Sequence, residues 1–581
     1  MAQWWIHIDL AGIQRYVYSS RTLLDGIGRA AQVEDATDAA LLDREHVLPV
    51  GIRVEFAAAG ALILSTPSRA DDDPARPPER VRSAVGAYTR WLYDRSGALT
   101  PVVAIQFVPD GGAAAAHLAA PDLLRHARHR MSPGVAGAVP PGVLRCSWTS
   151  APATRFERGK RIPIAEDADR ARERGRQWHD SQQGALLGAA PLPTGHTFAL
   201  PTLIDQLGRT ETVSSHVAVM VLDINDLGDA LRSLEAGELS TRAEVAEQLR
   251  VLSGELAGAL VHRVASAVED RDGTFSLAGT PVALEFPLHT SSPGEADIDS
   301  SDASSGRGVP APRLDGEVTE WLLPIRPWVI AGDDLVLVCE SRVAWDLATA
   351  AMDWLSAPAD DGARAALRGY GPSFGTGTHL TLTLGIGIAV VPVGYSLAAA
   401  HELASGLCKN AKRERRENDW PGHVVDWHRA PTTLPEVLAD RARSGPRSCG
   451  RPYHHIPAHL ETPGAYWKER DKPTWDDLMH LLDTDRADSL RSHHPRGDTH
   501  SWADRHGWVK TELLAAVRSS DDHAVAGVLA EKNAREQALT GTGMAELAAG
   551  VDARYRRGLI VDAIDLLDDH LQLRTVERSV S

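Results

Sequence analysis

The sequence predicts an α+β protein with two similar mixed domains and an all-α C-terminal domain. Short apolar runs typical of buried strands alternate with amphipathic helical patterns up to about residue 430, and the order of these elements recurs once along the chain. Beyond this point only helical patterns remain. The expected boundaries are 1–110 and 213–430 for the two mixed domains, 111–212 for a partly helical linking region, and 431–581 for the helical domain.

In the first mixed domain, strands are predicted where apolar residues form short runs, and helices where they recur every three or four positions. The predicted strands are 3–9, 52–56, 61–64 and 101–108, and the predicted helices are 12–24 and 79–95. The second and third of these strands flank a turn of small residues, which is typical of a hairpin.

The second mixed domain repeats this order with longer connections. A long helix is predicted over 241–269 because its apolar residues recur at i+3 and i+4 spacings. The predicted strands are 216–223, 321–330, 335–339, 380–391 and 424–427, and the further helices are 343–356 and 396–417. Segment 290–316 is rich in Ser, Gly, Asp and Pro, which predicts a disordered insertion.

The C-terminal domain is expected to consist of helices only. The helical patterns cover 433–444, 474–484, 508–534 and 543–573.

The composition excludes several classes of protein. The chain has 581 residues and a net charge of −17, which argues against a general nucleic-acid-coating protein but is compatible with a local basic groove. Its four cysteines are far apart, so they form neither a CxxC zinc pair nor a disulfide framework. The N-terminus lacks the basic segment of a signal peptide, and glycine and polar residues interrupt the most apolar stretch, 380–400. We therefore expect a cytoplasmic protein without a membrane segment.

The two mixed domains share short sequence motifs as well as element order. Residues 8–13 (IDLAGI) match 222–227 (LDINDL), and residues 59–62 (AGAL) match 331–334 (AGDD). Each domain therefore has a strand ending in Asp, then a helix, a hairpin, a helix and a strand. This order is the ferredoxin-like, or palm, arrangement of nucleotide polymerases and cyclases.

Three carboxylates are expected to meet in the second domain. In a palm domain the first strand ends beside the hairpin turn, so Asp223 is predicted to lie next to Asp333 and Asp334. Such carboxylates repel one another unless cations neutralise them. Hard divalent ions with oxygen ligands, Mg²⁺ or Mn²⁺, are the expected occupants, and two ions are expected. The competing interpretation is an ordinary acidic hairpin turn.

With these motifs, the sequence resembles the large, palm-containing subunit of type III CRISPR effector complexes. Members of that family have a degenerate first palm, a second palm with a GGDD motif and a helical C-terminal domain, and they make cyclic oligoadenylates from ATP. The resemblance implies that Asp333 and Asp334 take the places of the GGDD acidic pair and Asp223 that of the first-strand metal ligand. Lys412 would be a phosphate-binding lysine on the last palm helix. The motif departs from the family at Ala331, which replaces the first glycine.

The resemblance also implies a reaction. The 3′-hydroxyl of one ATP would attack the α-phosphate of another, with pyrophosphate leaving. The catalytic residues would be Asp223, Asp333 and Asp334, all three also being metal ligands. The residues expected to contact the nucleotide are Ile224, Asn225, Asp226, Leu227, Gly228, Gly332 and Lys412. The first palm keeps Asp9 but has Ala61 and Leu62 in place of the acidic pair, so it is expected to hold the acceptor nucleotide without a metal site.

Two other departures from the family limit the activities and sites that are expected. The sequence begins directly at the first palm and has no cysteine cluster between the palms, so neither an HD nuclease nor a zinc site is expected. An HD-less, divergent or stand-alone relative acting in antiviral defence fits these features. The expected partners are ATP as substrate and RNA or RNA-guided effector subunits as activator. No feature indicates a particular oligomeric state.

Two alternative functions are kept open. One is another enzyme of the palm class, such as a cyclic dinucleotide or mononucleotide cyclase. The other is a non-catalytic scaffold whose palms bind RNA or protein in a CRISPR-like complex. The three intact aspartates favour an enzyme.

Overall fold

The computed structural model describes residues 1–130, 142–188, 196–208, 216–290, 319–444, 450–460, 473–482 and 558–576, with short gaps within these ranges. The expected disordered insertion 290–316, apart from its first residue, lies outside them, as do helix 508–534 and most of helix 543–573. None of the described helices combines the length and the apolar character that crossing a membrane requires.

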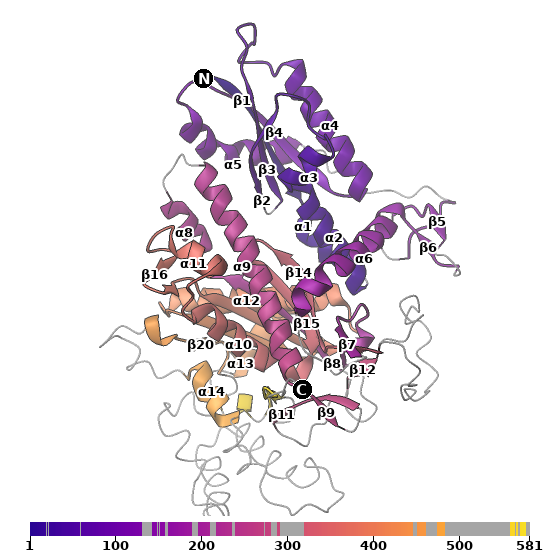
Figure 1. Ribbon diagram of the computed structural model, residues 1–581, viewed down its shortest axis with the longest axis vertical. Helices are drawn as coiled ribbons and strands as arrows, with labels where there is room; N and C mark the ends of the chain where they lie inside the picture. The colour runs from indigo at the N-terminus through magenta and orange to yellow at the C-terminus, as the bar shows by residue number, and fades with distance from the viewer. Residues whose placement is uncertain are drawn as a thin grey trace, which may run out of the picture.

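A four-stranded sheet forms the first mixed segment, in the order β2-β3-β1-β4, and every pair of neighbours is antiparallel. It lies at the top of Figure 1, with helices α1 to α4 beside it. The elements are β1 (Gln3–Ala11), α1 (Ile13–Tyr18), α2 (Leu23–Ala36), α3 (Ala39–Arg44), β2 (Arg53–Ala58), β3 (Ala61–Pro67), α4 (Glu79–Ser96) and β4 (Thr100–Val108).

A six-stranded sheet forms the second mixed segment, in the order β14-β15-β8-β18-β19-β20. Its first four strands are antiparallel neighbours, while β18 and β19 run parallel and are joined by a crossover helix. The elements are β8 (His216–Ile224), α8 (Leu227–Ser233), α9 (Leu239–Ser266), β14 (Ile325–Ala331), β15 (Asp334–Glu340), α10 (Ala344–Ser356), α11 (Gly362–Arg368), β18 (Leu384–Pro392), α12 (Leu397–Glu417) and β19 (His423–Arg429).

The two sheets therefore repeat one connection pattern. In each, the first strand lies between the second hairpin strand and a later strand, so β1 corresponds to β8 and the β2–β3 hairpin to β14–β15. The mixed α/β fold predicted from the sequence is confirmed, including the long helix over 241–269, which the structure gives as α9.

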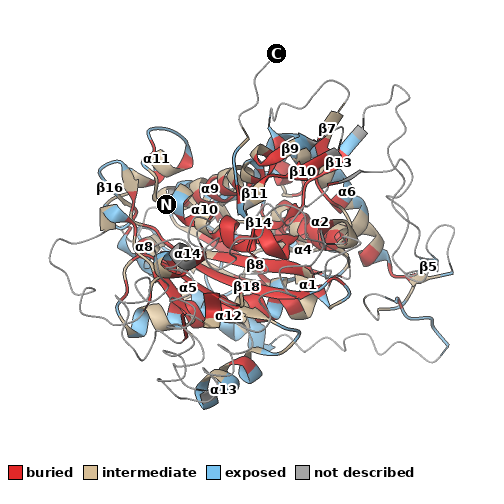
Figure 2. Cartoon of the chain, turned by 90° about the horizontal axis from the view of Figure 1, so that it is seen from below, coloured by how far each residue is buried: buried red, intermediate tan, exposed pale blue. Residues whose placement is uncertain are grey.

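The second sheet is buried on both faces because helices cover each side. Side chains on β8 alternate between two apolar cores: Ala218, Met220 and Leu222 pack with α9 and α10, whereas Val217 and Val219 pack with α2 and α12. A strand covered on both faces reads as a continuous apolar run, which is the pattern seen at 216–223. Figure 2 shows β8 and β18 as buried strands in the middle of the molecule.

The linking region packs onto the first segment through α6 (Glu166–Leu187), which crosses α2 at backbone contact. A Cβ atom on Gly28 would lie 1.7 Å from the carbonyl oxygen of Ala171, and one on Gly175 would lie 2.1 Å from that of Leu24. Only glycine permits two helices to approach so closely.

Other described elements are the 18-residue helix α5, one short helix and several short strands in the linking region, around the insertion and after α11. They are α5 (Ala113–Arg130), β5 (Arg155–Phe156), β6 (Pro163–Ile164), β7 (His196–Ala199), α7 (Asp205–Gly208), β9 (Val268–Arg271), β10 (Thr274–Leu277), β11 (Gly279–Thr280), β12 (His289–Thr290), β13 (Thr319–Leu322), β16 (Gly375–Thr376) and β17 (His379–Leu380).

The expectation of helices only beyond residue 431 is wrong in the described part. Strand β20 (Tyr453–His455) pairs with β19 and extends the second sheet, and β21 (Gln572–Leu573) pairs with β11. Helices α13 (Leu434–Ser444) and α14 (Trp475–Leu482) accompany them. Three residues carry too weak an alternation to reveal a strand, and the unpaired edge of β19 supplies the hydrogen-bond partners that make β20 one.

Candidate metal centre

Asp223, Asp333 and Asp334 converge at one end of the second sheet, as the sequence predicted. Each offers a carboxylate oxygen, and these oxygens lie within 4.8 Å of one another. Asp334 is directly opposite Asp223 in the β15–β8 ladder. Asp333 precedes it in a tight turn, where Gly332 adopts a φ of 61° that favours glycine.

The electrostatics of this cluster favour a bound cation. Burial raises the pKa of the Asp333 carboxyl, and the negative charge of Asp223 adds to this effect. The pKa of Asp334 is raised to about 7, mainly because surrounding protein atoms reduce its solvation and to a smaller extent because of the charges of Asp333 and Asp223. Asp334 nevertheless faces solvent at the opening of the site. An all-carboxylate donor set with this mutual repulsion fits Mg²⁺ or Mn²⁺, and the three aspartates would hold it.

Lys412 is part of the centre, but in a different way from the one expected. Its Nζ lies 2.7 Å from Oδ1 of Asp223 and donates a 2.7 Å hydrogen bond to the carbonyl oxygen of Ile224. The side chain is buried beneath the sheet end. An ammonium group has three donors, so one is left for a phosphate oxygen. The structure thus makes Lys412 first of all a counter-ion of Asp223.

The loop after β8 contains the other residues expected to contact the nucleotide. Asn225 is buried and its Nδ2 donates to Oγ1 of Thr383 at 2.9 Å. Leu227 is buried in the apolar core, whereas Gly228 is exposed. The side chains of Asn225 and Leu227 therefore support the fold.

Asp226 takes a left-handed conformation, with a φ of 53°. Its carboxylate is paired with Arg415 and lies 3.5 Å from Nε of Arg416. Both arginines are on the last turns of α12, so the loop after β8 is fixed to the same helix that carries Lys412.

The first sheet has no equivalent acidic cluster among its described residues. Asp9 lies opposite Ala61 in the β1–β3 ladder and is paired with Arg128 of α5. The ladder corrects the motif match by one residue: Ala61 corresponds to Asp334, and Gly60 to Asp333. Both turns have a glycine with positive φ, which led to the alignment of Gly60 with Gly332. Gly60 lies one residue before the position opposite the aspartate, however, and Gly332 lies two residues before it.

Three residues that sequence reasoning missed also bear on the centre. Ser253 of α9 is buried and its hydroxyl donates a 2.6 Å hydrogen bond to the carbonyl oxygen of Gly332. The charge of Lys409 lowers the pKa of Asp334. Burial raises the pKa of Tyr18, and the charge of Asp334 adds to this effect. The three-residue spacing from Lys412 could have indicated Lys409. Nothing in the sequence indicated Tyr18, which comes from α1 of the other segment.

A cavity of about 650 Å³ lies between α1 and α12 and shares with this cluster the two residues Tyr18 and Lys409, which interact with the charge of Asp334. Tyr18 and Lys409 both line it, and Arg15 and Thr433 lie on its wall. The Tyr18 ring is stacked on His401, with 3.3 Å between ring centroids. The cavity therefore combines aromatic and cationic groups, and both segments contribute to it.

Comparison with known proteins gives structural relatives only. No protein-family model and no curated protein matches the chain. Solved structures that are similar include the Csm1–Csm4 cassette in complex with cA4 (14% identity, TM-score 0.46, covering 97% of this chain and 70% of that one). Csm1 of T. onnurineus has the same identity and a TM-score of 0.45, with 97% and 69% covered. The Csm1–Csm4 subcomplex of the type III-A CRISPR–Csm interference complex has 14% identity and a TM-score of 0.44, with 97% of this chain and 70% of that one covered. The resemblance noted from the sequence is thus confirmed: the chain is similar in fold to Csm1 of type III CRISPR complexes.

Proposed function

We propose that the protein is a metal-dependent nucleotidyltransferase that converts ATP into cyclic oligoadenylate-type second messengers. In this proposal the two mixed segments are palm domains, the first of them degenerate, and the described part of the C-terminal segment packs onto the second. The observation that carries it is the cluster of Asp223, Asp333 and Asp334 on adjacent antiparallel strands, which the first sheet lacks at the matching positions.

Each group has a defined task in the proposed reaction. Asp223, Asp333 and Asp334 hold the divalent ions, which when bound offset the charge of the triphosphate and of the attacking 3′-oxygen. Lys412 keeps Asp223 in place and offers its remaining donor to a phosphate oxygen. A new bond forms between the 3′-oxygen and the α-phosphorus, and the bond from that phosphorus to pyrophosphate breaks.

The cavity between α1 and α12 is the proposed place of the acceptor nucleotide. Its stacked Tyr18 and His401 rings offer an aromatic surface, and Lys409 offers a cation to a phosphate. Two of its lining residues, Tyr18 and Lys409, interact with the charge of Asp334, which supports an acceptor hydroxyl directed from this cavity toward the metal centre. Both segments are required for this arrangement.

A nucleotide-conversion assay tests the proposal. The full chain is incubated with each NTP and Mg²⁺ or Mn²⁺, with and without RNA, and products are identified by mass spectrometry. We expect an ATP-derived cyclic oligonucleotide that disappears in Asp333→Ala/Asp334→Ala. A cyclic dinucleotide or mononucleotide would instead establish another enzyme of the palm class. Absence of both product and metal-dependent AMPPNP binding would contradict the proposal and favour a scaffold.

A further inference from the structure

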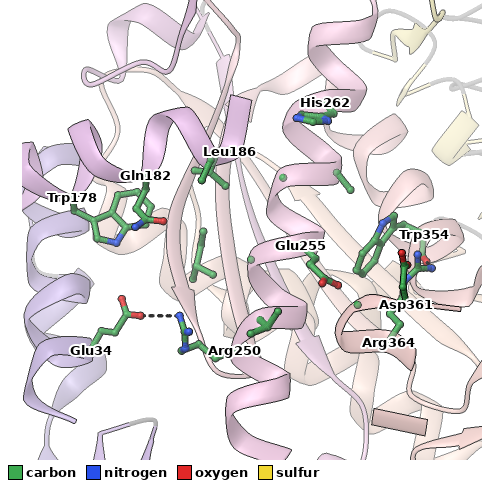
Figure 3. Close-up of a pocket in the computed structure, with 17 residues that line it drawn as sticks. Glu34, Trp178, Gln182, Leu186, Arg250, Glu255, His262, Trp354, Asp361 and Arg364 are labelled. Carbon is green, nitrogen blue, oxygen red and sulfur yellow. Dashed lines mark hydrogen bonds and ion pairs between the residues drawn. The ribbon is translucent and has the colours of Figure 1, made fainter. Parts of the chain in front are cut away.

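A second cavity, of about 680 Å³, crosses helix α9 away from the three aspartates. Figure 3 shows Trp178 and Glu34 on one side of α9, and Trp354, Asp361 and Arg364 on the other. We propose that this cavity is a docking site for a lysine- or arginine-bearing segment of a partner protein, and that its occupancy is transmitted to the metal centre. The docking itself does not depend on the proposed reaction.

The floor of the cavity is formed by two helix glycines against which no described residue packs. Gly254 and Gly258 lie one turn apart on α9, and a Cβ atom at either position would meet no described atom within 4 Å. Glycine is less favourable than alanine inside a helix, and here no packing within the described chain requires it. The absence of side chains lets a second segment approach the helix backbone.

The charges of the cavity favour a cationic occupant. Arg250 is already paired with Glu247, at 2.7 Å, and with Glu34, at 3.4 Å. Arg364 donates to the carbonyl oxygens of Trp354, at 2.6 Å, and Ala357, at 3.1 Å. Arg250 is therefore neutralised within the chain, whereas the charge of Arg364 acts on Glu255 and Asp361 together.

The carboxylates on the α11 side are less committed. Glu255 accepts only the backbone N–H of Ala363, at 3.1 Å, and Asp361 forms no hydrogen bond or ion pair with another described residue. Glu255 and Asp361 share the single guanidinium of Arg364, so this side of the lining keeps a net negative charge, beside the indole rings of Trp178 and Trp354. A segment with a Lys or Arg side chain and an apolar face complements this arrangement, whereas an acidic segment would be repelled.

The cavity is connected to the metal centre through two contacts. Ser253, next to Gly254, donates its hydroxyl hydrogen bond to the carbonyl oxygen of Gly332. Ile330 of β14 lines the cavity and lies two residues before Gly332, which follows the end of that strand. A segment that displaces α9 or Ile330 therefore acts on the turn that carries Asp333.

Fluorescence anisotropy with a designed probe tests the docking. The probe is a labelled helical peptide of Leu, Ala and Lys, and its counterpart has Glu in place of Lys. We expect the basic peptide to bind the full chain and the acidic one not to bind. Glu255→Gln/Asp361→Asn, which keeps the shapes, and Gly258→Leu, which fills the floor, should each weaken binding by about tenfold or more.

The matched control is Asp360→Asn/Asp440→Asn, which removes two exposed carboxylates outside the cavity and should leave binding unchanged. Circular dichroism verifies that each variant is folded. Binding of the acidic peptide, equal binding by the cavity variants, or no binding to the wild-type chain would each overturn the proposal.

Mn²⁺ titration tests the connection separately. Saturation with the basic peptide should change the Mn²⁺ dissociation constant by about fivefold in the wild-type chain and much less in Ser253→Ala. An unchanged constant would overturn the transmission but not the docking. Asp333→Ala/Asp334→Ala should still bind the peptide, so a failure of the proposed reaction is distinguishable from a failure of docking.

Discussion

Asp334 lies directly opposite Asp223, where strand β15 begins and strand β8 ends. The equivalent pair in the first sheet is Ala61 and Asp9. One sheet therefore holds facing carboxylates at the end of its central strands, and the other holds a single carboxylate neutralised by Arg128. This asymmetry makes Asp9 a natural internal control for Asp223.

Asp223→Asn should weaken divalent-metal binding, since it removes one carboxylate of the cluster while keeping its size. We expect a loss of at least about tenfold in Mn²⁺ affinity, measured by electron paramagnetic resonance, and of nucleotide conversion if the proposed function holds. Asp9→Asn makes the same chemical change at the matching position and should leave Mn²⁺ affinity unaltered. Equal effects of the two variants would argue against a metal centre at Asp223.

The raised pKa of Asp334 predicts a pH-dependent stability. The folded chain keeps this proton up to about pH 7, whereas the unfolded chain loses it near 3.8. Without metal, Asp334 therefore destabilises the folded state increasingly as the pH rises from about 4 to about 7. Asp334→Asn should melt higher than the wild type at about pH 8 in EDTA, and at the same temperature at about pH 4.

Divalent ions should reverse this difference. Mn²⁺ favours the ionised carboxylate, so its affinity for the wild type should increase across the same pH interval. If the difference in melting temperature between Asp334→Asn and the wild type in EDTA did not change with pH, Asp334 would have its ordinary pKa of 3.8 in the folded chain.

Lys412→Met should destabilise the chain, because it leaves the Ile224 carbonyl and the Asp223 carboxylate without their shared donor. We expect a loss of about 1–3 kcal/mol in the free energy of unfolding, measured by urea denaturation without metal. Lys409→Met, on the exposed side of the same helix, should cost much less. Added Mn²⁺ should restore part of the stability of Lys412→Met, since the ion replaces the missing positive charge.

Gly28→Ala should separate α2 from α6, because its methyl group would overlap the carbonyl group of Ala171. Overpacking of this kind costs about 1–3 kcal/mol, which thermal and urea denaturation would detect. Gly184→Ala, in α6 where a Cβ meets no described atom within 4 Å, should be neutral or slightly stabilising. A neutral Gly28→Ala would mean that the two helices are not in backbone contact.

The sequence by itself determined much of the second sheet and its site. The continuous apolar run of β8, the hairpin around Gly332 and the i+3 and i+4 spacing of α9 are local patterns, and each predicts its element without reference to the rest of the chain. Asp223, Asp333 and Asp334 could be assembled from these elements alone, because hairpin geometry and the strand order place their ends together.

Only the tertiary structure decided the features that depend on distant partners. Strand β20 exists because β19 has a free edge, and Lys412 turns to Asp223 because burial beneath the sheet end leaves its ammonium no nearer acceptors than that carboxylate and the Ile224 carbonyl. Tyr18 reaches the vicinity of Asp334 only when α1 packs against α12. Such contacts join residues far apart in sequence, and no local periodicity encodes which of many possible surfaces will meet.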